Sequence, residues 1–179
     1  LHRPRVGRAI RRAVQRAARV LEAHGARVEP LARPAFAKAF DIWAATVAEA
    51  MEADYYELIG GGERIRFARE ALRMATGRSR HTLPALAAVW GERTLQRPGR
   101  RRTRLVELGK KLQADLEETL GPAGVLLHPT YPRPATRHGL ALLRPFDTGL
   151  TSLFNALELP VTQAPMGLTR GLPVGVQIA

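Results

Sequence analysis

Two serines and three lysines are the side chains with which this sequence could attack a carbonyl group or activate the attack. Ser79 lies in Gly-Arg-Ser-Arg-His and Ser152 in Leu-Thr-Ser-Leu-Phe. A serine nucleophile needs an adjacent base and backbone N–H groups for the oxyanion, which small, glycine-lined surroundings provide. Neither serine has such surroundings, and side chains two apart, as in Ser79 and His81, do not face each other on a helix. We therefore predict no catalytic residue here, and turn or capping chemistry for Ser79.

The histidines offer no metal-binding pattern. No pair has the close spacing of a zinc motif, and His-Glu-x-x-His is absent. The chain has no cysteine, which excludes disulfides and thiolate ligands. We expect neither a metal nor a cofactor. The five histidines are His2, His24, His81, His128 and His138.

Short apolar runs bounded by proline or glycine surround His128 and recur near the end of the sequence. Runs of this length between turn signals are typical of buried strands. They comprise residues 125–127, 161–164 and 174–178. Between the first two, Asp147 or Thr148 can cap a helix that reaches about Leu157. Residues 121–179 thus follow an α/β order, in which ligands bind at the carboxyl ends of the strands. On that rule His128, Thr130 and Tyr131 lie beside a site.

The preceding residues read as mainly helical. An apolar stripe predicts a helix over residues 7–24, and alternation over 27–31 predicts a short strand. A helical segment follows over 34–120, with helices expected from Pro34, over 63–76 and over 105–120. The arginine-rich stretch 96–104 is expected to be an exposed joint before the last helix.

Charge is the most unusual feature of the composition. The formal net charge is +12, and arginine supplies most of the 28 basic residues. A basic excess can favour nucleic acid, but the basic run has neither interleaved aromatics nor a reader motif. We therefore interpret the charge as solvated helix surface and expect no nucleic-acid partner. No stretch reaches the ~20 apolar residues that a spanning helix needs. A membrane surface stays open as a partner.

Several motifs resemble amidase-signature hydrolases, nearest the fatty-acid amide hydrolase-like branch. They are VLLHPTYPRPATRH, FDTGLTSLFNALELPVTQAPMGL and GLPVGVQIA after Gly124, with ATGRSRHTLPAL and LEAHGARVEPL upstream. The resemblance implies an α/β fold with a mixed sheet flanked by helices, of which this chain is an incomplete C-terminal portion. It also implies hydrolysis of amide bonds, possible substrates being fatty-acid or other apolar amides. The resemblance places the family's two serines well upstream, in a glycine- and serine-rich segment that this sequence lacks, with the lysine some tens of residues before it.

The expected role of the chain is scaffold and substrate wall. Leu150, Leu153 and Leu157 are expected in the core, and the first turn of their helix should point towards the site. The predicted substrate-binding residues are Thr130, Tyr131, Thr151, Phe154 and Asn155, with Phe154 as a plain core aromatic the alternative. We expect residues 1–179 to form a single partial domain, cut at both ends and inactive alone.

Two other functions stay open at this point. The first is a glutamine-hydrolysing amidotransferase subunit of the same superfamily. The second, from a different class, is a basic helical nucleic-acid-binding module. The expected partner of the complete protein is a small-molecule amide, and the expected location is the cytoplasm. The sequence predicts no oligomeric state.

Overall fold

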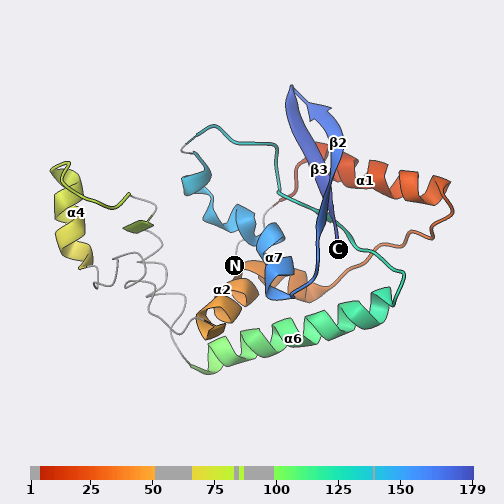
Figure 1. Ribbon diagram of the computed structural model, residues 1–179, viewed down its shortest axis with the longest axis horizontal. Coiled ribbons are helices and arrows are strands. Elements are labelled where there is room, and N and C mark those ends of the chain that lie inside the picture. Colours follow the sequence, from red (N-terminus) through yellow and green to blue (C-terminus); the bar gives the residue numbers. More distant parts are fainter. Residues whose placement is uncertain (1–4, 51–65, 83–84, 87–98, 139) are drawn as a thin grey trace. The chain divides into compact units, whose positions relative to one another are not determined.

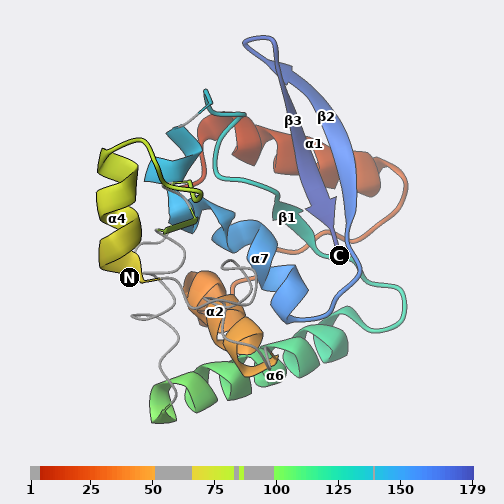
Figure 2. The same cartoon turned by 60° about the vertical axis from the view of Figure 1, so that its left-hand side comes forward.

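The computed structural model describes residues 5–50, 66–82, 85–86, 99–138 and 140–179. They belong to two compact units, one of residues 1–43 with 107–179 and one of residues 44–106. The first unit holds the sheet and the segments that position the site (Figures 1 and 2). The second holds α4 (Phe67–Ala75) and the turn that follows it. No helix among the described residues is long and apolar enough to cross a bilayer.

The sheet of the first unit has the strand order β1-β3-β2, and both pairings are antiparallel. The strands are β1 (Leu127–Pro129), β2 (Thr162–Thr169) and β3 (Leu172–Ile178). The β2–β3 hairpin turns through Arg170 and Gly171, whose positive φ angles of 51° and 77° suit a type I′ turn. The pairing is irregular between Pro165 and Leu168, as expected where proline cannot donate to the ladder.

The central strand is buried on both faces of the sheet. Residues 174–177 are all buried, and successive side chains point to opposite faces. On one face Val174 packs with Ile10 and Ala13 of α1 (Arg8–Ala23). On the other face lies His128, whose ring meets Phe154 of α7 (Gly149–Ala156). One helix therefore covers each face of the sheet, α1 on the side of Val174 and α7 on the side of His128.

The long helix α6 (Arg100–Leu120) crosses α2 (Ala39–Ala50) at a glycine. A Cβ added at Gly109 would lie 2.8 Å from Cγ2 of Ile42, so the crossing depends on the missing side chain. Leu112 and Leu116, which follow Gly109 in the same helix, are also buried, and Leu116 has no solvent-accessible surface. Arg33, just before η1 (Pro34–Lys38), pairs with Asp115 and donates to Thr119 Oγ1 at 2.8 Å.

Most of the predicted elements are present, with shifted bounds. The fold class of helices around a sheet is confirmed, and the three strands described are antiparallel. The strand predicted over residues 27–31 is wrong, since residues 26–33 carry no helix or strand. The joint predicted over 96–104 is also wrong in its second half, because α6 begins at Arg100; residues 96–98 lie outside the described ranges. Residues 63–65 of the helix predicted over 63–76 lie outside them as well.

We predict that Gly109→Ala destabilises the first unit. Overpacking against Ile42 costs about 1–3 kcal/mol, and the helix propensity of alanine returns at most about 1 kcal/mol. Urea unfolding of residues 1–179 should therefore show a net loss. Ile42→Leu in the same background removes the clashing methyl branch and should restore stability, with Ile42→Leu alone as control. A Gly109→Ala variant more stable than the wild type would contradict this account of the crossing.

Candidate functional site

The loop that follows β1 is held by contacts from two separate parts of the chain, the residue before α1 and the continuous η3–α7 stretch of residues 145–156. The Gly7 N–H, just before α1, donates to the Pro132 carbonyl at 2.7 Å. The Thr151 hydroxyl of α7 donates to the Thr130 carbonyl, also at 2.7 Å. Arg133 pairs with Asp147. Because these contacts hold three of its residues, the loop of residues 130–133 is fixed in position directly after β1.

Arg133 and Asp147 form a two-pronged ion pair beneath the loop. The Arg133 Nε donates to one carboxylate oxygen at 2.8 Å and Nη2 to the other at 3.3 Å. Asp147 is 5% exposed and lies in η3 (Pro145–Thr148), where its own N–H donates to the Arg144 carbonyl. A guanidinium fork on a buried carboxylate is geometrically specific as well as strong. The pair therefore fixes the direction of the loop as it leaves Pro132.

Tyr131 stands at the centre of this loop and is partly buried. Burial raises the pKa of its phenol above the usual 10.0, and the negative charge of Asp147 raises it further, while Arg133 and Arg144 act in the opposite direction. The phenol is therefore protonated at neutral pH and can donate a hydrogen bond to a carbonyl or another acceptor.

A row of polar side chains crosses the sheet next to the loop. His128, Gln177 and Gln163 are register partners on the three strands, so their side chains share one face. Gln163 Oε1 accepts the Thr130 hydroxyl at 2.5 Å, which links the row to the loop. The Gln163 amide lies over Gly175, where an added Cβ would be 1.9 Å from Nε2. A side chain at position 175 would displace this amide.

His128 is the most unusual titratable group of the row. The residue is 8% exposed. The centroid of its ring lies 5.9 Å from that of Phe36 and 5.1 Å from that of Phe154, both in edge-to-face geometry. Burial lowers its pKa from 6.5 to about 4, and the Pro129 backbone opposes this weakly, so the ring is neutral. In the described part of the chain, His128 Nδ1 and Gln177 Oε1 have no hydrogen-bond partner. Two buried polar atoms thus need a donor or a water.

The structure brings three of the five predicted substrate-binding residues close to one another. Thr130 and Thr151 are hydrogen-bonded, and Tyr131 follows directly in the same loop. Asn155 is exposed at the far end of α7. Phe154 is 1% exposed and packs on His128, so it is part of the core in the described unit. The substrate-binding role of all five stays a prediction. Sequence reasoning missed the pairing of Arg133 with Asp147, which the fold of residues 130–148 brings together, and the row that includes Gln163 and Gln177, which meet through the register of the sheet.

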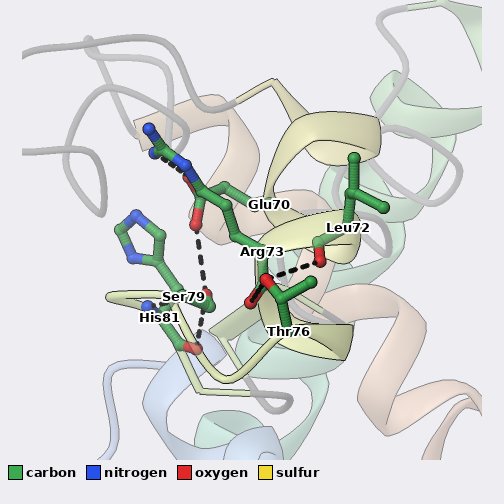
Figure 3. A network of polar contacts seen from close by, with 6 residues as sticks. All are labelled: Glu70, Leu72, Arg73, Thr76, Ser79 and His81. Carbon is green, nitrogen blue, oxygen red and sulfur yellow. Dashed lines mark hydrogen bonds and ion pairs between the residues drawn. The ribbon is translucent and has the colours of Figure 1, made fainter.

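Neither serine is placed to act as a nucleophile within its unit. The Ser152 hydroxyl is buried and donates to the Thr148 carbonyl four residues back in α7, at 2.9 Å. Ser79 belongs to the turn after α4 (Figure 3), where it donates to the His81 carbonyl at 3.0 Å and accepts the His81 N–H at 3.1 Å. The turn chemistry predicted for Ser79 is therefore confirmed. The lysines Lys38, Lys110 and Lys111 are exposed.

Glu70 is the nearest candidate base to Ser79, and its surroundings make it a weak one. One oxygen of its carboxylate accepts Arg73 at 2.7 Å, and the other lies 3.1 Å from Ser79 Oγ, whose single proton is shared between this carboxylate and the His81 carbonyl (Figure 3). The Arg73 hydrogen bond lowers the pKa of Glu70, although burial acts against it. A carboxylate with a lowered pKa takes a proton less readily. This network serves to close the turn onto α4.

Comparison with known proteins gives a family, relatives and folds. The family model described as Amidase matches residues 2–179. The chain is 36% identical over 161 residues to "Fatty-acid amide hydrolase 2-A" of Danio rerio, covering 86% of this chain and 30% of that protein. "Fatty-acid amide hydrolase 2" of Homo sapiens is 33% identical over 126 residues, covering 69% and 24%. The chain thus spans less than a third of the length of either relative.

Two solved structures share the fold. A crystal structure of an amidase superposes with a TM-score of 0.62 at 24% identity, covering 98% of this chain and 38% of that one. A glutamyl-tRNA(Gln) amidotransferase subunit of Thermotoga maritima superposes with a TM-score of 0.56 at 22% identity, covering 99% and 35%. At these identities the likeness supports the fold alone. The expected incomplete α/β fold is confirmed, because nearly all of this chain matches about a third of each structure.

We predict that His128 makes stability depend on pH below neutrality. The unfolded imidazole binds its proton near pH 6.5 and the folded one only near pH 4, so stabilisation is complete above pH 6.5 and is lost as the pH falls towards 4. The loss should be about 3 kcal/mol. Urea unfolding across this range should give a shallower pH dependence for His128→Gln than for the wild type. The exposed His138→Gln serves as control, and equal slopes for wild type and His128→Gln would refute the buried neutral ring.

We also predict that Asp147→Asn lowers the pKa of Tyr131. Removing the carboxylate charge removes one of the two causes that raise the phenol pKa, while the lowering effect of Arg133 and Arg144 remains. Phenolate absorbance during alkaline titration, with the Tyr131→Phe spectrum subtracted, measures this pKa. Asp115→Asn, which breaks a different arginine pair, should leave it unchanged. An unchanged or higher Tyr131 pKa in Asp147→Asn would show that the two groups do not interact.

Proposed function

This chain belongs to the amidase family, and on that premise we propose that it forms part of an amide-bond hydrolase, with the loop of residues 130–133 as one wall of the amide site. The nucleophile and its base belong, in this proposal, to the portion of the family fold that the chain does not match. The relatives' names suggest a fatty-acid amide as the substrate class. A small-molecule amide is therefore the proposed partner of the complete protein.

The observation that carries this proposal is the convergence of tethers on the loop. Gly7 lies before α1, Asp147 and Thr151 lie in the continuous η3–α7 stretch, and the three contact three different residues of the loop. Positioning groups before the reaction is a main source of enzymatic rate enhancement.

The proposed mechanism is acyl transfer through a serine supplied from outside this segment. That serine attacks the carbonyl, backbone donors stabilise the oxyanion, and water releases the acid. The loop contributes orientation: the protonated Tyr131 phenol is available as a donor, and the Thr130 hydroxyl is oriented by Gln163. The chain's own serines take no part, because both are engaged with backbone carbonyls.

The glutamine-hydrolysing alternative has weaker support. The relatives above 30% identity are named as fatty-acid amide hydrolases, whereas the amidotransferase is similar at the level of fold. Both alternatives use an amide substrate, so the wall proposed for residues 130–133 is common to them. An experiment distinguishes the two alternatives by the acyl group of the amide that is hydrolysed, a fatty acyl chain or the side chain of glutamine.

A chimera tests this function. We propose the Danio rerio protein with its matching segment replaced by residues of this chain, assayed on oleamide and on glutamine. The chimera should hydrolyse oleamide, and residues 1–179 alone should hydrolyse neither. A folded chimera without amidase activity, beside an active zebrafish protein, would sink the proposal. Turnover by residues 1–179 that Ser79→Ala or Ser152→Ala abolishes would sink it too.

Within the chimera we predict that Thr151→Val lowers kcat/KM for oleamide. The variant loses one neutral hydrogen bond to the Thr130 carbonyl, worth about 0.5–1.5 kcal/mol, or roughly a two- to twelvefold effect. Thr103→Val, at an exposed position of α6, is the matched control and should leave kcat/KM unchanged. Equal values for the two variants would mean that the loop does not contact the substrate.

A further inference from the structure

Positive charge remains uncompensated around the loop that follows β1. Between residues 121 and 157 the sequence holds three arginines and a single acidic residue, Asp147. Asp147 is buried and already paired with Arg133, so it does not neutralise the other two arginines. Those two, Arg137 and Arg144, are exposed and have no ion-pair partner among the described residues. Two guanidinium groups near the loop are therefore available to an anion.

Arg144 is held beside the loop by two successive contacts. It directly precedes η3, and its carbonyl accepts the Asp147 N–H at 3.1 Å. The Asp147 carboxylate in turn binds Arg133, which lies two residues after Tyr131. Burial raises the pKa of the Tyr131 phenol most strongly, while the charges of Arg133 and Arg144 act in the opposite direction. Arg144 thus lies within electrostatic reach of this hydroxyl.

The phenol and the guanidinium group offer complementary donors to a carboxylate. The protonated Tyr131 hydroxyl donates one hydrogen bond, and a guanidinium group presents a fork of N–H donors that matches two carboxylate oxygens. Arg133 shows this geometry in the structure, because its Nε and Nη2 bind the two oxygens of Asp147. Arg144 carries the same fork without such a carboxylate in the described part of the chain.

Exposed apolar side chains flank Arg144 in the sequence. Leu143 precedes it and is 77% exposed, and Phe146 follows it at 42%. The Phe146 ring rests on that of Phe40, with the ring centroids 5.2 Å apart in edge-to-face geometry. A cation between apolar side chains complements a ligand that joins a carboxylate to a hydrocarbon chain. A small inorganic anion would leave the apolar side chains uncovered.

We propose that Arg144, together with the Tyr131 hydroxyl, binds a carboxylate on the amine portion of the amide substrate, which makes N-acyl amino acids the preferred substrate class. The inference rests on the proposed function, in which the loop is a wall of the amide site. The relatives' names suggest an apolar acyl chain, so the charge falls on the amine. Hydrolysis breaks the C–N bond, adds the hydroxyl of water to the acyl carbon and its proton to the nitrogen, and releases a fatty acid and an amino acid.

The chimera tests this preference with two matched amides. N-oleoylglycine carries a carboxylate on its amine portion, and N-propyloleamide is an uncharged amide of similar size. We expect a higher kcat/KM for N-oleoylglycine. Arg144→Gln should lower the ratio of the two kcat/KM values about tenfold, as expected for the loss of a hydrogen bond to a charged group. Arg144→Lys should keep part of the preference, because it retains the charge without the fork.

Two controls separate this site from the general charge of the protein. Arg19→Gln makes the same change of charge at an exposed position of α1 and should leave the ratio unchanged. Added salt should lower the wild-type ratio, because it screens an exposed ion pair. The inference is overturned if Arg144→Gln changes the ratio no more than Arg19→Gln does, and continued hydrolysis of N-propyloleamide would then leave the proposed function standing. Turnover of glutamine that Arg144→Gln lowers would also overturn it, by assigning the cation to a carboxylate on the acyl portion.

A binding measurement decides the inference if the chimera hydrolyses neither amide, an outcome that would sink the proposed function. N-lauroylglycine and lauramide are titrated separately into residues 1–179, and the arginine Nε–H signals are followed by NMR. We expect N-lauroylglycine to shift the signal of Arg144 and lauramide to leave it in place. Equal shifts with the two ligands, or no shift with either, would show that Arg144 binds no carboxylate and overturn the inference.

Discussion

The pairing of β1 with β3 is the interaction on which the unit of residues 1–43 and 107–179 depends. It places His128 opposite Gln177 and brings the loop after Pro129 within reach of α7 and of the segment before α1. Because β3 is buried on both faces, a shift of register by one residue would exchange its valines with Gln177 and Gly175. The register therefore determines both the core and the position of the loop.

The core of this unit contains buried polar side chains, and their hydrogen bonding affects the stability of the unit. His128 stays neutral between two phenylalanines, and the buried carboxylate of Asp147 is paired with Arg133. A buried polar group without a partner costs about 1–3 kcal/mol, so Nδ1 of His128 and Oε1 of Gln177 are sites where added chain, water or ligand would stabilise the protein. Both residues share the sheet face of Gln163, whose side chain accepts the Thr130 hydroxyl of the proposed amide site.

Local patterns in the sequence predicted the helices and the β-strands of residues 121–179, because an apolar stripe or a short run between turns reports the faces that must be buried. The position of Thr130, Tyr131 and Thr151 near one another followed from the rule about strand ends. The row of His128, Gln177 and Gln163 could not be predicted, since it depends on strand register, and the ion pair of Arg133 with Asp147 depends on the path of the chain between residues 133 and 147. Residues 26–31 show the converse: a strand pattern forms a strand only beside a partner.

The central claim is that the loop of residues 130–133 is held in a fixed position before any substrate binds. Hydrogen exchange at the Gly7 amide tests it most directly, because this N–H donates to the Pro132 carbonyl at 2.7 Å and belongs to a different segment. We predict that it exchanges about as slowly as the Leu126 amide within the sheet. Exchange at the rate of an unstructured peptide, with Leu126 still protected, would contradict the claim by showing that the loop moves freely on an intact sheet.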